Sequence, residues 1–103
     1  MGGSYGLIGA IIPEGFDEFI VYPNPFKPVR GDEYIFFEGL PENSRIRIYD
    51  IAGNLIKEAI DKEAIWEWDV RDKEGKKVDS GIYIYIVTTD EGLKRIGKIG
   101  VIR

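Results

Sequence analysis

The sequence predicts an all-β domain, an antiparallel β-sandwich of about seven strands. Short apolar runs are separated by clusters of Gly, Pro, Asn and Asp at intervals of roughly 8–12 residues, which is typical of such sandwiches. Within several runs the apolar side chains recur at every second position, the period of a pleated strand. No stretch sustains the period of an amphipathic helix.

The richest of these stretches is 65–87, which holds two strand-like runs joined by a charged loop over 71–80. We expect the two runs to form a hairpin, with Gly75 at the turn and Gly81 where the second strand begins. The residues that alternation places on the inward faces are Trp66, Trp68 and Val70 in the first run and Tyr83, Tyr85 and Val87 in the second.

The remaining strands are predicted at 19–22, 34–37, 45–49, 54–60 and 93–102. Pro23 and Pro25 stop the first of them, so this strand lies at a sheet edge or at a kink between sheets. The segment 55–64 is rich in helix-favouring Lys and Glu, but the tight turn at 50–53 favours a hairpin partner instead.

A chain of 103 residues is long enough for a single core. We expect the domain at 18–103, with 1–17 as an N-terminal tail, a linker, an extra strand or an addition made for expression. The apolar run at 5–12 is too short to span a bilayer. We expect no direct membrane insertion, and any secretory signal peptide would lie upstream of this sequence.

The composition excludes several classes of function. A net charge of −4 argues against binding to nucleic acid or an anionic membrane. The chain has no Cys and no His, so it lacks disulfides, the commonest transition-metal ligands and the commonest general base. Abundant Ile, Lys and Glu without Gln is a composition typical of thermophiles.

Four acidic residues in and around the charged loop suggest a calcium site, but the Asp-x-Asp-x-Asp-Gly spacing of a dedicated loop is missing. These residues are Asp69, Asp72, Glu74 and Asp79. Asp is also a routine turn residue, and Ser80 has no histidine to activate it. We therefore expect no metal, no cofactor and no catalysis.

An alternative function is carbohydrate binding, with Trp66, Tyr49 and Tyr34 as an aromatic platform. Against it, aromatic residues at strand period more often belong to a core. The isoleucines Ile82, Ile84 and Ile86 pose a second question, because they fall on the outer face. Either that face turns inward after all, or the run 5–12 covers it, or it docks a neighbouring domain or a second copy.

The segment 79–83 (DSGIY) is typical of an immunoglobulin-like sandwich, in which a tyrosine hydroxyl bonds back across a corner of the chain. Tyr83 is the tyrosine in question. The sandwich is therefore predicted to be of the immunoglobulin-like or fibronectin-III-like type.

Four blocks taken in order also resemble a known family: VYPNPF at 21–26, IRIYDIAGNLI at 46–56, the segment 68–83 from WDVRD to SGIY, and the closing strand 98–103. They resemble the immunoglobulin-like C-terminal domains of large bacterial secreted proteins. That family includes the domain of flagellar hook-capping proteins and the type A sorting domains of type IX secretion. The match covers about 19–103 and departs from the family at Val70, where glycine is usual. The structural residues of the blocks are Pro23, Asn24, Pro25, Phe26, Asp50, Gly53, Trp68, Asp69, Asp72, Gly75, Gly81 and Tyr83.

The resemblance implies a non-catalytic C-terminal module of a larger exported protein, located outside the cell or on its surface. Its implied role is export sorting or domain anchoring, by contact with the secretion machinery or with neighbouring domains. A homodimer formed by strand exchange or edge pairing is a further expectation. The residues predicted for the partner surface are Ile82, Ile84, Ile86, Lys98, Ile99 and Val101.

Overall fold

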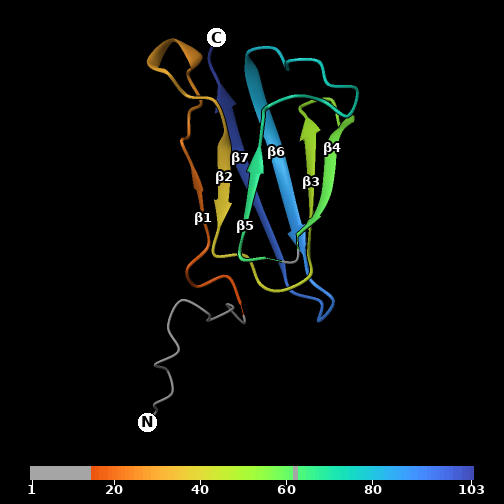
Figure 1. Cartoon of the computed structure of the whole chain (residues 1–103). Helices are drawn as coiled ribbons and strands as arrows, with labels where there is room; N and C mark the ends of the chain where they lie inside the picture. The colour runs from red at the N-terminus through yellow and green to blue at the C-terminus, as the bar shows by residue number, and fades with distance from the viewer. Residues whose placement is uncertain (1–14, 62) are drawn as a thin grey trace.

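The computed structural model describes residues 15–61 and 63–103, and these form an all-β sandwich of seven strands (Figure 1). The prediction of an all-β sandwich is therefore confirmed. The elements are β1 (Ile20–Tyr22), a single turn of 3-10 helix, η2 (Pro28–Arg30), and then β2 (Ile35–Glu38), β3 (Ser44–Asp50), β4 (Leu55–Asp61), β5 (Ile65–Trp68), β6 (Gly81–Thr88) and β7 (Lys94–Val101).

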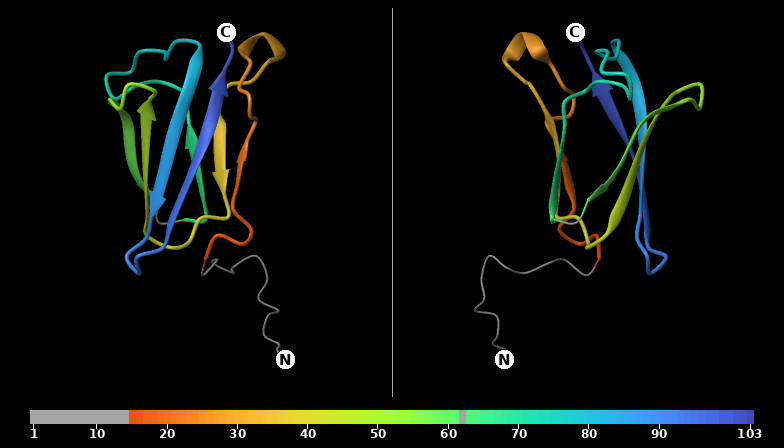
Figure 2. Two further views of the ribbon diagram at one scale, coloured as in Figure 1. Left: turned by 180° about the vertical axis from the view of Figure 1, so that it is seen from behind. Right: turned by 45° about the vertical axis from the view of Figure 1, so that its right-hand side comes forward.

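The strands form two antiparallel sheets that face each other (Figure 2). One has the order β1-β2-β5 and the other has the order β4-β3-β6-β7. β1 and β5 are therefore the edges of the three-stranded sheet, and β4 and β7 are the edges of the four-stranded sheet. None of the described residues belongs to a helix long and apolar enough to cross a membrane.

The core lies between the sheets and is built by strict alternation along the strands. In β3, Ile46 and Ile48 are fully buried, whereas Arg45 and Arg47, which alternate with them, face outward. Aromatic side chains from the two sheets meet edge to face, with ring centroids 6.5 Å apart for Trp68 and Tyr83. The buried apolar residues are Phe26, Ile35, Phe37, Leu40, Ile46, Ile48, Trp68, Val70, Val78, Tyr83, Tyr85, Val87, Ile99 and Val101.

The predicted hairpin over 65–87 is wrong. β5 pairs with β2 in the three-stranded sheet, whereas β6 pairs with β3 and β7 in the other. The charged loop 69–80 therefore crosses from one sheet to the other, and the two runs meet through side chains across the core. Alternation identifies the inward face of a strand, but it does not say which strand lies beside it.

The kink predicted at Pro23 and Pro25 carries the chain between the sheets. β1 is an edge of the three-stranded sheet, and just after the kink Phe26 pairs with Val101 of β7 in the other sheet. The Phe26 amide donates to the carbonyl of Gly100 at 2.8 Å, and its carbonyl accepts from the amide of Ile102 at 2.9 Å.

Two further predictions concern the ends of the strand pattern. Within the segment 55–64, residues 55–61 form strand β4 as the hairpin turn predicts, and not a helix. The predicted closing strand is β7, paired along its whole length with β6. The run 5–12, proposed as an extra strand or as a cover for the outer face, lies outside the described residues.

Candidate partner-binding surface

The turns and strand ends of the four sequence blocks lie at one end of the sandwich, the upper end in Figure 1. Strands β1, β3 and β7 end there, and β6 begins there (Figure 1). The fold thus gathers at one end segments that are far apart in the sequence.

The kink is fixed to β7 by the side chain of Asn24, which makes the hydrogen bonds that a neighbouring strand would make. The Asn24 amide nitrogen donates to the carbonyl of Lys98 at 2.9 Å, and its oxygen accepts from the amide of Gly100 at 3.0 Å. The prolines on either side have no amide hydrogen, so the side chain supplies the hydrogen bonds that the backbone cannot. Asn24 therefore caps the upper part of the β7 edge.

The β3–β4 turn is organised by Asp50. One of its carboxylate oxygens accepts from the amides of Ala52 and Asn54 at 3.0 and 2.8 Å. These bonds and the Asn54 side chain, which is the largest influence, lower the pKa of Asp50 below its ordinary 3.8. Gly53 sits at φ +92°, in the left-handed region that glycine adopts at no steric cost.

The loop after β5 is held by its own acidic residues. Asp72 accepts from the amides of Glu74 and Lys76, both at 2.9 Å, and these bonds lower its pKa. Asp69 accepts from the amide of Arg71 at 3.2 Å. Within 15–61 and 63–103 no group of three acidic side chains is placed to hold a metal ion. The carboxylates of Asp69 and Asp72 therefore have a structural explanation as turn residues.

Val70, at the position where the resemblance would lead us to expect glycine, has a backbone conformation that glycine adopts more easily. Its φ is +60°, a conformation that costs a β-branched residue roughly 1–3 kcal/mol. Its side chain is fully buried in the core, and that burial offsets the strain. Next to it, the indole of Trp68 donates to the carbonyl of Arg71 at 2.9 Å, which ties the start of the loop to the core.

The corner before β6 has the predicted tyrosine contact. The Tyr83 hydroxyl donates to the carbonyl of Asp79 at 2.7 Å. Burial, the largest influence, raises the pKa of Tyr83 above 10, and the charge of Asp79 adds to it. The amide of Arg103 donates to the hydroxyl of Ser80 at 2.8 Å, so the last residue is fastened to the same corner.

The outer face of the four-stranded sheet carries an apolar stripe among basic residues. Ile82 and Ile96 are 46% and 57% exposed, and Ile84 and Ile86 are half-buried between them. Ile86 pairs with Ile96 in the register of β6 and β7, so the stripe spans both strands. We call Ile82, Ile84, Ile86 and Ile96 the isoleucine face.

Basic residues border this face on both sides. Lys98 pairs with Ile84 in the register, and Lys94 lies two residues before Ile96 on the same side of β7. On β3, Arg45 and Arg47 both bind Glu58 of β4, each at 3.0 Å.

Two residues predicted for the partner surface do not lie on it. Ile99 and Val101 are 0% and 2% exposed, because their positions in β7 point toward the other sheet. They belong to the core and are withdrawn from the surface. Ile96 takes their place, and the alternation within 94–101 was the sequence signal that could have found it. A shallow hollow of about 520 Å³ lies beside the face, over Gly100 and between Ile82 and Pro25.

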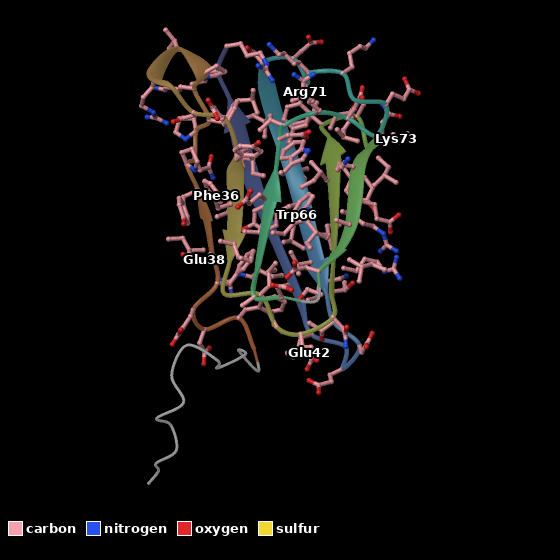
Figure 3. All side chains as sticks on the ribbon, in the orientation of Figure 1. Phe36, Glu38, Glu42, Trp66, Arg71 and Lys73 are labelled. Carbon is pink, nitrogen blue, oxygen red and sulfur yellow. The ribbon has the colours of Figure 1, made fainter. Side chains whose placement is uncertain are left out.

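The aromatic platform predicted for carbohydrate does not assemble. Trp66 points inward against Phe37, with ring centroids 5.2 Å apart. Tyr49 lies on β3 and Tyr34 just before β2, in different sheets. Figure 3 shows Trp66 on β5 and Phe36 on the neighbouring strand β2. The three predicted rings therefore share no surface.

The class of the protein is a seven-stranded antiparallel β-sandwich of the immunoglobulin-like type, with an apolar stripe bordered by basic residues on the outer face of one sheet. Comparison with protein families is specific: residues 29–102 match the CHU_C type IX secretion signal domain. The chain belongs to this family. The family is described by a signal for secretion, and this implies that a protein carrying the domain is exported to the cell surface or beyond.

Two solved structures from Porphyromonas gingivalis are similar to the chain. One is PorZ, described as an essential bacterial surface component of the type IX secretion system, at 26% identity and a TM-score of 0.76. The other is dimeric latent PorU, at 25% identity and a TM-score of 0.61. The similarity covers 92% and 82% of this chain but only 13% and 9% of theirs, so it concerns one domain of each. No curated protein matches the chain.

Proposed function

We propose that this domain is a C-terminal sorting module that the type IX secretion machinery recognises through the isoleucine face. The family supplies the secretion role. The observation that carries the surface is a contiguous stripe of four outward isoleucines on β6 and β7, of which Ile82 and Ile96 are exposed and Ile84 and Ile86 half-buried. Contiguous apolar surface bordered by polar residues is typical of protein–protein contact.

The basic residues around the face indicate the character of the partner. The whole chain has a net charge of −4, yet Lys94 and Lys98 border the isoleucines on β7. Neither lysine forms an ion pair among the described residues. A partner that buries isoleucine and presents acidic groups at the rim would complement this surface.

The experiment compares export of a reporter fused to the full chain with export of a variant carrying Ile84→Thr and Ile86→Thr. Threonine keeps the β-branched shape that suits a strand but removes much of the apolar surface. The matched control carries Ile51→Thr and Ile65→Thr, which change exposed isoleucines in a turn and in the other sheet. The host is a bacterium with type IX secretion, and thermal unfolding shows that each fusion is folded.

We expect the face variant to stay in the periplasm while the control variant is exported. Equal export of both would contradict recognition through this face. If the unaltered fusion is not exported, sorting in that host is rejected and packing on a neighbouring domain of the parent protein becomes the leading function. Deletion of 98–103 is a poor test, because it also removes Ile99 and Val101 from the core.

A further inference from the structure

Strand β7 is an edge whose two halves differ. In an edge strand the backbone groups of every second residue point away from the sheet. In the upper half, Asn24 and Phe26 bind these outward groups on Lys98, Gly100 and Ile102. Asn24 and Phe26 therefore take the place of a neighbouring strand along the upper part of the β7 edge only.

The lower half of the same edge has no such partner among the described residues. By the same alternation, the outward groups there are the carbonyl of Lys94, the amide and carbonyl of Ile96 and the amide of Lys98. We call 94–98 the open edge. An extended segment lying beside it would continue the line begun by Asn24 and could bind all four groups.

The side chains of the open edge select what can lie there. Lys94, Ile96 and Lys98 fall on the outer side of the sheet, in the order basic, apolar, basic. On the inner side of the strand, Gly97 lies directly against the ring of Tyr85, where a Cβ atom would clash with the ring. Lysines on an edge strand discourage pairing with ordinary apolar strands.

We propose that the open edge of β7 receives an extended acidic segment of the secretion machinery by strand addition. The segment carries an acidic residue, an apolar residue and a second acidic residue at alternate positions. These would lie beside Lys94, Ile96 and Lys98 as cross-strand pairs. This inference rests on the proposed function and names the chemistry of the partner at one border of the isoleucine face.

A second copy of the chain fits this edge badly. Two antiparallel β7 edges centred on Ile96 would set Lys94 of one copy against Lys98 of the other, twice. Like charges placed directly opposite are unfavourable in a sheet. The charges therefore favour an acidic partner over the edge-paired homodimer that the sequence also suggests.

The test uses the full chain and a fluorescently labelled peptide of sequence Thr-Glu-Thr-Val-Thr-Glu-Thr. Its glutamates and valine repeat the acidic, apolar, acidic pattern on one face. We expect saturable binding by fluorescence anisotropy that weakens as salt rises, together with slower hydrogen exchange at the amides of Ile96 and Lys98. A peptide with lysine in place of both glutamates should not bind.

Two variants separate the contributions of charge and backbone. Lys94→Glu with Lys98→Glu should weaken the acidic peptide about tenfold or more and create binding of the lysine peptide. Ile96→Pro removes one outward amide at an edge position where proline is tolerated, and should also weaken binding. The charge-matched control is Lys73→Glu with Lys77→Glu, in the loop at 69–80, which should bind as the unaltered chain does.

Absence of binding, or equal binding by the charge-reversed and control variants, overturns the proposal. So does binding without protection of the Ile96 and Lys98 amides, because it would mean attachment elsewhere. These outcomes leave the export experiment untouched. Export that depends on Ile84 and Ile86 while the peptide fails would reject strand addition alone. Peptide binding without export of the unaltered fusion would reject the sorting role instead.

Discussion

The two outer faces of the sandwich both carry large apolar side chains, yet they differ in charge and in packing. The face of the four-stranded sheet combines isoleucines with Lys94, Lys98 and a pair of arginines that share one glutamate. The face of the three-stranded sheet combines aromatic rings with Glu38 and Glu67. One face is basic and aliphatic, and the other is acidic and combines its aromatic rings with the exposed Ile20 and Ile65 at its two edges.

The two faces also differ in how far their apolar side chains cover one another. On the three-stranded sheet, the ring centroids of Tyr22 and Phe36 lie 5.3 Å apart in a stacked pair, and Tyr34 lies 6.3 Å from Phe36. These rings cover part of one another. The isoleucine face has no covering layer among the described residues. We therefore assign recognition to the isoleucines and a mainly structural role to the rings.

The first prediction compares two isoleucines on β7 whose side chains point to opposite sides. Ile99→Ala should lower the free energy of unfolding by about 2–4 kcal/mol, because it leaves a cavity in the core. Ile96→Ala should lower it by only about 0.5 kcal/mol, because that side chain is 57% exposed. Urea unfolding followed by tryptophan fluorescence measures both.

Equal losses for the two variants would mean that β7 does not present one face to the core and the other to solvent. Val87→Ala, at a second fully buried position, serves as the reference for the core. Its loss should resemble that of Ile99→Ala and exceed that of Ile96→Ala.

The second prediction concerns the one acidic residue that the four-stranded sheet buries in the described part of the chain. Asp61 is 7% exposed, and its Oδ2 has no hydrogen-bond partner among the described residues. Burial raises the pKa of Asp61 to about 6, and the charge of Glu63 adds to this. Because the folded protein holds the proton more tightly than the unfolded chain, stability should fall as the pH rises from about 4 to about 6.

Asp61→Asn removes this ionisation and should raise the free energy of unfolding at pH 7 by about 1–3 kcal/mol. The variant should also lose the decline between pH 4 and pH 6 in denaturant midpoints measured at several pH values. An unchanged decline would show that another group causes it. The control is Asp17→Asn, at an exposed residue before β1, which should leave the pH profile as it is.

The sequence predicted the strands and their inward faces, because both depend on local alternation and on Gly and Pro punctuation. It did not predict that β5 and β6 belong to different sheets. The loop 69–80 can close a hairpin or cross the sandwich, and its charged composition fits either. Whether β5 and β6 pair with each other depends on which strands pair with β2 and β3, and the local sequence pattern does not indicate this.

The candidate surface could be predicted in part. Alternation in β6 identified Ile82, Ile84 and Ile86 as outward because two tyrosines and Val87 occupy the intervening inward positions. In β7 the prediction placed Lys98 on the surface together with its neighbour Ile99 and with Val101, although alternation counted from Lys98 puts Ile96 outward and Ile99 and Val101 inward. The open edge needed the structure, because only pairing shows which half of β7 the kink occupies.

The third prediction tests the structural role of the aromatic face. Phe36→Ala should lower the free energy of unfolding by about 1–2 kcal/mol, because it removes a half-buried ring that stacks on Tyr22. Export of the reporter fusion should not change. Loss of export by a variant that is still folded at the assay temperature would move recognition to the aromatic face and contradict the assignment made above.

The smallest expected effect is that of Glu58→Gln, which removes the carboxylate shared by Arg45 and Arg47. The hydrogen bonds from the two arginines hold the pKa of Glu58 in the folded protein below its ordinary 4.5. Its contribution to stability is therefore present above pH 4.5 and is lost as the pH falls through the pKa of the folded state. These ion pairs are exposed, and the unfolding midpoint at physiological salt should therefore barely change. The variant makes the basic face more basic, so the acidic peptide should bind slightly more tightly at low salt and equally at high salt. Tighter binding that persists at high salt would mean that Glu58 blocks the surface by contact and not by charge.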